Sequence, residues 1–297
     1  MSYQSGFVAI IGRPNVGKST LLNALIGQKV AIMSNRPQTT RNRIRGVLTR
    51  EDAQIVFIDT PGIHKPRHRL GEYMVEAAIG TLREVDVIVV VVDATDPVHE
   101  GDNDVLTLLD GVTTPTILCI NKVDATDKPR LLEMISRFSQ RHPFTAIIPI
   151  SAKDGTQLDE LTDVLIQQLP EGPQYYPKDM VTDHPEQFII AETIREKVLF
   201  LTREEIPHSV MVHIEQLERR ETGNTVYVHA IIYTERDSQK GILIGKGGGL
   251  LKKVGEMARV ELERLLGSKL YLELWVKVKK DWRNEPSMLH RFGFDDL

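Results

Sequence analysis

The sequence predicts a doubly wound α/β domain with a mostly parallel sheet, followed by a smaller α+β domain. Over residues 1–170, short runs rich in Val and Ile alternate with amphipathic segments, an order typical of strands and helices around a parallel sheet. Residues 171–188 are rich in proline and lack an apolar period, which indicates an extended interdomain strap. Residues 189–297 follow a different order of helices and strands, which indicates a second domain.

Each strand of the first domain is predicted from a short apolar run. These runs lie at residues 7–12, 54–59, 86–94, 114–121 and 144–151. Their nearly continuous Val and Ile content favours strands that are buried on both faces of a parallel sheet. The amphipathic segments between them predict helices over residues 18–27, 73–85, 130–141 and 156–169.

The second domain is predicted to contain a helix over 188–202 and strands over 209–219, 224–236 and 269–279. We interpret residues 242–266 as an apolar strand end, a glycine turn and a long amphipathic helix. In the last strand, alternation sends one set of side chains to the core, namely Leu270, Leu272, Leu274, Val276 and Val278. The opposite face fits either RNA contact or packing between domains, and it carries Tyr271, Glu273, Trp275, Lys277 and Lys279.

Composition argues against several classes of protein. The single cysteine, Cys119, lies in an apolar run, which excludes an internal disulfide and a cysteine-rich zinc site. The longest apolar run, residues 87–92, is far too short to span a bilayer, and no signal peptide is recognisable. A net charge of -4 argues against a surface coated in positive charge but leaves room for a local nucleic-acid-binding face.

The stretch GRPNVGKST, Gly12–Thr20, matches the phosphate-loop pattern GxxxxGK[ST] and lies between a predicted strand and a predicted helix. Its glycines let backbone N–H groups turn inward, and the helix N-terminus adds partial positive charge. In this pattern Lys18 reaches the β and γ phosphates and Ser19 is a ligand of Mg²⁺. The residues expected at the nucleotide are Gly12, Asn15, Val16, Gly17, Lys18, Ser19 and Thr20. The loop alone does not distinguish ATP from GTP.

Three later stretches indicate which nucleotide binds. Each of them lies at the C-terminal end of a predicted strand. In DTPG, Asp59 supplies a carboxylate for Mg²⁺ and Gly62 supplies an N–H near a γ-phosphate. In NKVD, the carboxylate of Asp124 accepts from two donors of guanine that adenine lacks. The residues of NKVD and SAK expected at the base are Asn121, Lys122, Asp124, Ser151, Ala152 and Lys153. The four motifs in this order predict a site for GTP or GDP with Mg²⁺.

A glycine-rich turn in the second domain is a separate nucleic-acid signal. Between apolar residues and an amphipathic helix, the turn fits the GxxG loop of a KH module of type II, in which glycines let an RNA backbone approach helix N-termini. The residues expected to contact RNA are Gly245, Lys246, Gly247, Gly248, Lys252 and Lys253. The alternative is a glycine hairpin beside a solvated lysine face.

Over essentially its whole length, the chain resembles the Era family of bacterial Ras-like GTPases. The resemblance rests on the four GTPase motifs, on PQTTR at 37–41, which looks like the first switch, on the strap at 170–183 and on LELWVKVK at 272–279. It implies a P-loop GTPase domain joined to a KH domain. It also implies hydrolysis of GTP, binding near the 3′ end of 16S ribosomal RNA, and assistance to maturation of the 30S subunit. By this resemblance Thr40, or else Thr39, closes over Mg²⁺.

The chain departs from Ras-like GTPases at Ile63, where they place the glutamine that orients the attacking water. The lone loop residue His64 is expected to be solvated. Asn15 is either a turn residue with left-handed backbone or, as the resemblance implies, a ligand of a monovalent cation such as K⁺. Two arginines, Arg13 and Arg41, are the candidate arginine fingers, and Asp93 and Asp96 are expected to form caps or turns. Catalytic roles are assigned to Lys18, Thr40, Asn15 and Gly62.

The expected partners are 16S ribosomal RNA and the 30S subunit, with a monomer favoured. We expect the protein in the cytoplasm, or peripherally at the inner face of the cell membrane. The alternative is a GTPase associated with translation or tRNA modification, whose second domain binds another RNA or a protein. The GxxG loop favours RNA. A membrane-surface GTPase would need a basic amphipathic helix, and the helix after the turn carries only a short Lys-Lys pair.

Overall fold

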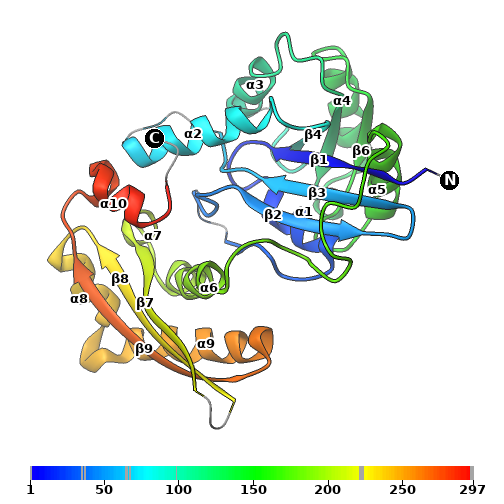
Figure 1. The fold of residues 1–297 in the computed structure, drawn as a ribbon. Coiled ribbons are helices and arrows are strands. Elements are labelled where there is room, and N and C mark those ends of the chain that lie inside the picture. The colour runs from blue at the N-terminus through cyan, green and yellow to red at the C-terminus, as the bar shows by residue number, and fades with distance from the viewer. Residues whose placement is uncertain are drawn as a thin grey trace. The chain divides into compact units, whose positions relative to one another are not determined.

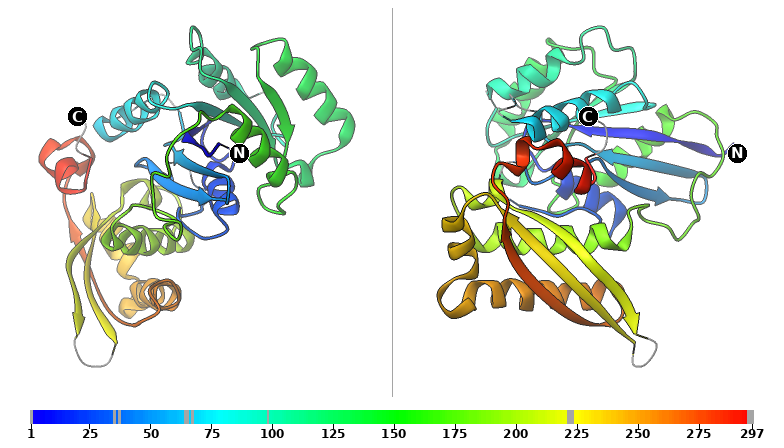
Figure 2. Two further views of the ribbon diagram at one scale, coloured as in Figure 1. Left: turned by 45° about the vertical axis from the view of Figure 1, so that its right-hand side comes forward. Right: turned by 60° about the vertical axis from the view of Figure 1, so that its left-hand side comes forward.

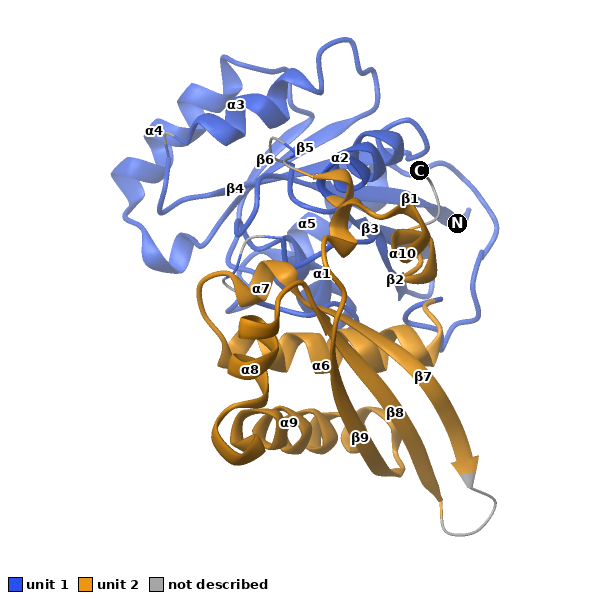
Figure 3. Ribbon diagram, turned by 90° about the vertical axis from the view of Figure 1, so that its left-hand side faces the viewer, with its two compact units in different colours: residues 1–67, 71–183 blue, residues 68–70, 184–297 orange. Residues whose placement is uncertain are grey.

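The computed structural model describes residues 2–34, 36, 38–63, 66, 68–97, 99–220 and 224–294. The chain divides into two compact units, which Figure 3 distinguishes by colour. Unit 1 comprises residues 1–67 and 71–183, and unit 2 comprises residues 68–70 and 184–297. Within the described part of the chain, no helix has the length and apolar character needed to cross a bilayer. The positions of Pro37 and His64 lie outside the described residues.

Unit 1 contains a six-stranded sheet in the order β2-β3-β1-β4-β5-β6 (Figure 1). Its strands are β1 (Gln4–Ile11), β2 (Ile44–Thr49), β3 (Ala53–Asp59), β4 (Val87–Asp93), β5 (Thr116–Asn121) and β6 (Ala146–Pro149). All neighbouring pairs are parallel except β2 with β3. The five predicted strands and the mostly parallel α/β class are therefore confirmed. β4 is buried at every position, as its nearly continuous apolar run predicts.

Helices cover both faces of this sheet, as the views in Figures 1 and 2 agree. They are α1 (Lys18–Ile26), α2 (Arg69–Thr81), α3 (Glu100–Thr107), α4 (Lys128–Ser139) and α5 (Leu158–Gln168). Residues of α2, α3 and α4 share one apolar core with alternate residues of β1, β4 and β5. This arrangement brings the carboxyl ends of the parallel strands to one edge, where the phosphate loop and the NKVD stretch meet.

Two elements of unit 1 have no signal in the sequence pattern. The antiparallel strand β2 contains Gly46, a residue that weakens strand patterns, and an outward-facing Arg45. A Cβ on Gly46 would lie 2.8 Å from Leu22 Cδ1, so the glycine permits close approach of α1. The short helix α3 is largely polar, and His99 caps its start by accepting a hydrogen bond from the Gly101 backbone N–H.

Residues after α5 run along unit 1. The Ser5 hydroxyl donates to Pro173 O at 2.7 Å, and Gln54 Oε1 accepts from the backbone N–H groups of Tyr175 and Tyr176. Farther along, Val47 N donates to Val181 O at 2.9 Å. These bonds satisfy backbone groups of a segment that has no regular structure of its own. The division of the chain into 1–170, a strap at 171–188 and 189–297 stays a prediction.

Unit 2 is a three-stranded sheet in the order β7-β8-β9, with β7 antiparallel and β9 parallel to the central strand. Its strands are β7 (Met211–Arg220), β8 (Thr225–Thr234) and β9 (Lys269–Val278). Its helices are α6 (Glu186–Leu201), α7 (Ile206–Ser209), α8 (Asp237–Ile244), α9 (Gly249–Leu266) and α10 (Pro286–Arg291), and its 3₁₀ turns include Lys246–Gly248 and Trp282–Asn284. The helices α6 and α9 lie side by side and bury one face of the sheet (Figure 2).

The predicted strand end before the glycine turn is wrong, because residues 237–244 form the helix α8. Gln239 Oε1 accepts from the backbone N–H groups of Glu235 and Arg236, which caps the start of this helix, and Gly245 ends it. A short apolar run such as Ile242–Ile244 has no period that separates strand from helix, so tertiary context decides.

The predicted alternation along β9 is confirmed. Leu270 and Val276 are buried, and Leu272 and Leu274 pack against the same core. On the other face Tyr271 is 59% and Trp275 is 53% exposed, so within the described part of unit 2 these aromatic rings are largely accessible.

Candidate functional site

The phosphate loop is shaped by residues that tolerate unusual backbone angles. Gly17 has φ 102° and starts α1, and Asn15 has φ 66°. A Cβ on Gly12 would lie 2.5 Å from Val91 O, and a Cβ on Gly17 would lie 2.3 Å from Asn121 Nδ2. Glycine is therefore required at both ends of the loop because neighbouring strands approach its backbone closely.

Lys18 lies buried at the start of α1 and reaches back over the loop. Its Nζ donates to Gly12 O at 3.0 Å and to Arg13 O at 2.9 Å. Burial lowers the pKa of Lys18 to about 8, an effect that the nearby Asp59 carboxylate partly opposes. The ammonium group is thus held where phosphate oxygens can replace two carbonyl acceptors.

A cluster of oxygen ligands lies beside Lys18. Ser19 Oγ donates to Asp59 Oδ2 at 2.6 Å and lies 2.8 Å from Thr40 Oγ1, which is 3.3 Å from the same carboxylate oxygen. Asp59 is fully buried, and its Oδ1 has no hydrogen-bond partner among the described residues. Burial, more than any other effect, raises the pKa of Asp59 to about 6. A buried carboxylate that lies between two hydroxyls and keeps one oxygen without a partner among the described residues fits a hard cation such as Mg²⁺.

The structure distinguishes the two switch threonines. Thr40 joins Ser19 and Asp59, whereas Thr39 Oγ1 donates to Arg36 O at 2.6 Å. Arg36 itself lines the phosphate cleft. Sequence reasoning missed Arg36, because a lone loop arginine carries no pattern that separates a cleft residue from a solvated one.

The side chain of Asn121 joins the base-binding motifs to the phosphate loop. Asn121 Nδ2 donates to Val16 O at 2.8 Å, and its Oδ1 accepts from Ala152 N at 2.9 Å. Asp124 Oδ1 accepts from Ser151 Oγ at 2.7 Å, which leaves its carboxylate oriented beside the SAK stretch. The structure therefore unites NKVD, SAK and the phosphate loop in one site.

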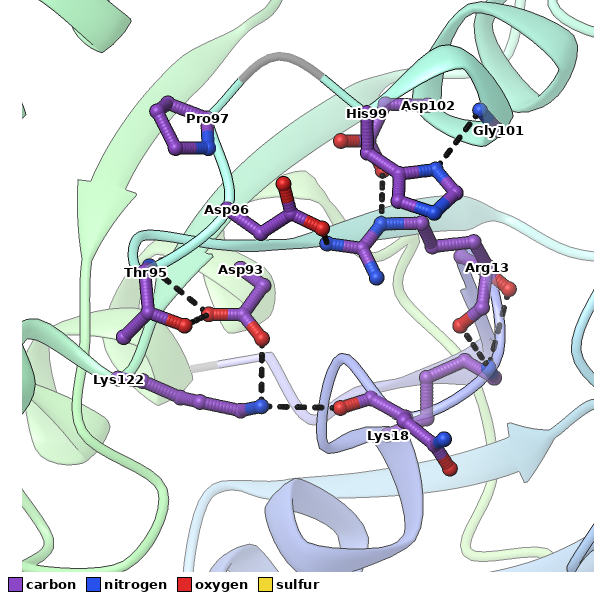
Figure 4. Close-up of polar contacts among 12 residues, drawn as sticks. Arg13, Lys18, Asp93, Thr95, Asp96, Pro97, His99, Gly101, Asp102 and Lys122 are labelled. Carbon is purple, nitrogen blue, oxygen red and sulfur yellow. Dashed lines mark hydrogen bonds and ion pairs between the residues drawn. The ribbon is translucent and has the colours of Figure 1, made fainter. Parts of the chain in front are cut away.

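Lys122 extends this junction to the end of β4. Its Nζ donates to Asn15 O at 3.0 Å and pairs with Asp93 Oδ2 at 2.5 Å (Figure 4). Asp93 Oδ1 accepts from the backbone N–H and the hydroxyl of Thr95, so the predicted turn role of Asp93 is confirmed. The pairing of Asp93 with Lys122 has no sequence signal, since Asp93 ends β4 and Lys122 follows the neighbouring strand β5.

The cleft between these groups is lined by residues of the phosphate loop, the first switch and NKVD, among them Pro14, Asn15, Lys18, Ser19, Thr40, Gly62 and Lys122. A Cβ on Gly62 would lie 2.8 Å from Pro14 Cγ, which explains why glycine stands there. Ile63 is buried in the apolar core of unit 1, so this position offers no polar group to a water molecule. Lys153 is exposed beside the base-binding residues.

In unit 2 the predicted GxxG turn is confirmed, and it joins two helices, α8 and α9, where the sequence predicts a strand end before it. Gly245, Gly247 and Gly248 have φ of 72°, 60° and 78°, and Lys246 and Gly247 are exposed. Lys252 and Lys253 are also exposed on the first turns of α9, and Lys252 Nζ lies 3.9 Å from Glu256. The turn thus presents accessible backbone and ammonium groups on one side.

A groove continues from this turn between α9 and the edge strand β9. It is lined by Gly248, Leu251, Lys252, Gly255, Glu256, Arg259, Leu270, Tyr271, Leu272 and Leu274. Apolar walls with a few charged groups fit bases and phosphates together. Sequence reasoning missed Arg259 and left Tyr271 undecided, because only the packing of α9 against β9 brings them together.

Comparison with known proteins supports both halves of this description. A family model described as a 50S ribosome-binding GTPase matches residues 7–122, and a KH domain model matches residues 205–283. GTPase Era of Carboxydothermus hydrogenoformans is 55% identical over 297 residues, which are 100% of this chain and of that protein. GTPase Era of Heliobacterium modesticaldum is 58% identical over 293 residues, or 99% of this chain and 98% of that protein.

Two solved structures are similar along almost the whole chain, each with a TM-score of 0.95 and coverage of 98% of this chain and 99% of that chain. One is a crystal structure of a variant of Aquifex aeolicus Era bound to GDP.AlF4-, at 44% identity. The other is Era in complex with MgGDPNP and nucleotides 1506-1542 of 16S ribosomal RNA, at 43% identity.

Proposed function

Because the chain belongs to the Era family of GTPases, we propose that its GTP cycle controls binding of the 3′ end of 16S ribosomal RNA by unit 2, in the service of 30S subunit maturation. The main support for nucleotide binding is the Asn121 side chain, since it joins the phosphate loop to the base-binding loops. The related Era bound to both MgGDPNP and 16S ribosomal RNA supports the RNA side. Such a partner implies a cytoplasmic location.

The guanine base is bound by the NKVD and SAK stretches in this proposal. Asp124 accepts from the ring N–H and the exocyclic amine, while a backbone N–H of the SAK stretch other than that of Ala152, which donates to Asn121 Oδ1, meets the carbonyl. Ser151 orients the Asp124 carboxylate through the 2.7 Å hydrogen bond. A site built around these polar groups rejects adenine, because its donors and acceptors would then stay unpaired.

The phosphates are bound by the backbone N–H groups from Asn15 to Thr20 and by Lys18, which exchanges the carbonyls of Gly12 and Arg13 for phosphate oxygens. Ser19 and Thr40 would hold Mg²⁺ directly, and Asp59 would do so through water. Mg²⁺ held by these residues would neutralise negative charge that develops on the phosphate oxygens. The Gly62 N–H faces the γ-phosphate, which makes the switch sensitive to hydrolysis.

Hydrolysis proceeds without a water-orienting glutamine, because Ile63 is apolar and buried. Asn15 lines the cleft, and its amide oxygen is a suitable ligand for K⁺, which would supply positive charge beside the phosphates. The backbone of Asn15 is also left-handed, as its turn role requires. The two roles are compatible, since one uses the backbone and the other uses the side chain.

Unit 2 binds RNA through the GxxG turn and the groove beside it. Gly245, Gly247 and Gly248 admit the sugar-phosphate backbone, and Lys246, Lys252 and Lys253 contact phosphates. The groove between α9 and β9 would receive the bases.

This function is tested with a fluorescent RNA that corresponds to the 3′-terminal segment of 16S ribosomal RNA. Anisotropy titrations at one stated salt concentration compare the protein bound to a non-hydrolysable GTP analogue with the protein bound to GDP. We expect tighter RNA binding in the GTP-analogue state, and release of phosphate from GTP in a parallel assay. Equal affinity for this RNA and for a scrambled RNA of the same length would contradict the proposed partner.

A further inference from the structure

Arg13, the second residue of the phosphate loop, pairs with two carboxylates that follow β4: Asp96 precedes α3, and Asp102 lies in its first turn. Its Nε donates to Asp102 Oδ1 at 3.1 Å, and its Nη2 lies 3.3 Å from Asp96 Oδ2. Figure 4 shows the Arg13 side chain directed toward these carboxylates while its carbonyl faces Lys18. A guanidinium group held by two carboxylates is not available as an arginine finger. Arg13, one of the two candidates, is therefore excluded from that role.

The two ion pairs of Arg13 differ in burial. The side chains of Arg13 and Asp102 are 8% and 4% exposed, whereas that of Asp96 is 52% exposed. Solvent screens the outer pair, so Asp96 contributes little to holding the guanidinium. The inner pair is shielded, and removal of one partner would leave the other charge buried and uncompensated.

A second link joins the phosphate loop to the end of β4. Lys122 pairs with Asp93, the last residue of β4, and donates to Asn15 O, so the loop is linked to Asp102 directly through Arg13 and to Asp93 indirectly through Lys122. The carbonyls that accept from Lys18 belong to Gly12 and to Arg13 itself, so the Arg13 link lies directly beside them. The start of α3 therefore holds Arg13 directly, and the end of β4 holds Asn15 through Lys122, which itself lines the cleft.

We propose that Arg13 is a positioning residue for the GTPase reaction, which acts through its buried pair with Asp102. The pair anchors the phosphate loop on the start of α3, and this anchor keeps the loop's N–H groups directed at the phosphates. Pre-organised donors bind a ligand without an ordering cost at the moment of binding, so a loosened loop releases nucleotide faster. This inference rests on the proposed GTPase function and adds the Arg13–Asp102 pair to the residues that support nucleotide binding.

The test is the dissociation rate of a fluorescent GDP derivative from the purified full chain, well below its melting temperature. Wild type is compared with Arg13→Gln, Asp102→Asn and the double variant. The control is Arg50→Gln, which breaks an exposed pair with Asp163 in the same unit. We expect dissociation about tenfold faster in each single variant, no further acceleration in the double variant, and no change in the control.

Thermal melts in saturating GDP show which variants are folded, and Asp102→Asn alone carries the test if Arg13→Gln does not fold. Rates within twofold of wild type in folded variants, or single effects that multiply in the double variant, would overturn the role of the pair. Wild type that neither binds GDP nor hydrolyses GTP would overturn the proposed function instead. In Arg13→Lys, which keeps the charge but loses the planar fork, the dissociation rate should lie between those of wild type and Arg13→Gln.

Discussion

Asn121 lies so close to Gly17 that no side chain fits between them. A Cβ on Gly17 would lie 2.3 Å from Asn121 Nδ2, the same atom that donates to Val16 O at 2.8 Å. The contact cannot relax without loss of the hydrogen bond that joins the phosphate loop to the base-binding strand. This relationship explains why the phosphate loop and NKVD act as one binding site.

The first prediction follows from that contact. Gly17→Ala should weaken binding of Mg²⁺-GDP by about 2–3 kcal/mol, because the new methyl group displaces Asn121 in addition to straining a left-handed backbone. Isothermal titration calorimetry measures the change. The matched control is Gly27→Ala at the end of α1, where φ is 74° and no atom lies within 4 Å of the added Cβ. Similar losses of affinity in both variants would show that backbone strain alone matters.

The second prediction concerns the base. Asp124→Asn should weaken GTP binding by a few kcal/mol and improve binding of xanthosine triphosphate, whose second carbonyl accepts from an amide N–H. Competition titrations with GTP and xanthosine triphosphate measure the change in nucleotide preference. A variant that retains the wild-type preference for GTP would rule out Asp124 as the residue that reads guanine.

Much of this site could be predicted from the sequence because its motifs are local. The strand-loop-helix setting of Gly12–Thr20 and the strand ends at Asp59 and Asn121 fix which residues meet at one sheet edge. The pairs Lys122–Asp93 and Arg13–Asp102 could not be predicted, since each joins segments that no spacing rule connects. The different contacts of Thr40, beside Asp59, and Thr39, at Arg36, likewise depend on where a loop turns.

The fold, like the site, could be predicted from the sequence only in part. Val- and Ile-rich runs predict the parallel strands, but β2 carries Gly46 and a polar outer face, and the apolar run at the end of α8 predicts a strand end. Both errors concern short elements whose apolar residues are too few to establish a period. The groove beside α9 depends on Arg259 and Tyr271, which are neighbours only after packing.

The third prediction concerns pH. The raised pKa of Asp59, about 6 against 3.8, means that the folded chain holds this proton more tightly than the unfolded chain. Its contribution to stability is present below pH 3.8 and is lost as pH rises through about 6. The lowered pKa of Lys18, about 8, has the opposite sign: stability is regained as pH rises from about 8 toward 10.5.

Nucleotide-free protein should therefore lose about 1–1.5 kcal/mol of unfolding free energy from pH 5 to pH 7, relative to Asp59→Asn. Urea denaturation of both proteins at the two pH values gives the comparison. A constant difference between wild type and variant would mean that Asp59 titrates normally in the folded chain.

The fourth prediction concerns RNA. Lys246→Asp places negative charge on the exposed GxxG turn, so affinity for the 3′-terminal RNA should fall at least about tenfold while GDP affinity is unchanged. Lys128→Asp changes the charge equally at an exposed position on α4 and serves as the control. Filter binding at one salt concentration compares the two. Equal losses in both variants would point to general electrostatics instead of a defined turn.

The fifth prediction concerns the monovalent cation. GTP hydrolysis should be slow in Na⁺ and faster in K⁺ at equal ionic strength, and Asn15→Gly should abolish the difference while nucleotide binding persists. Glycine is chosen because it keeps the left-handed backbone that Asn15 adopts, with φ 66°. Phosphate release is measured in both salts. Identical wild-type rates would remove K⁺ from the mechanism.

The central claim is that the nucleotide in this site controls RNA binding by unit 2, and the Asp124→Asn variant tests it most directly. The measurement is its affinity for the 3′-terminal 16S RNA with non-hydrolysable analogues of either xanthosine or guanosine triphosphate, at concentrations where wild type is saturated by the guanosine analogue. We predict wild-type RNA affinity with the xanthosine analogue and at least about tenfold weaker binding with the guanosine analogue. The same RNA affinity with either analogue and with no nucleotide would contradict the claim.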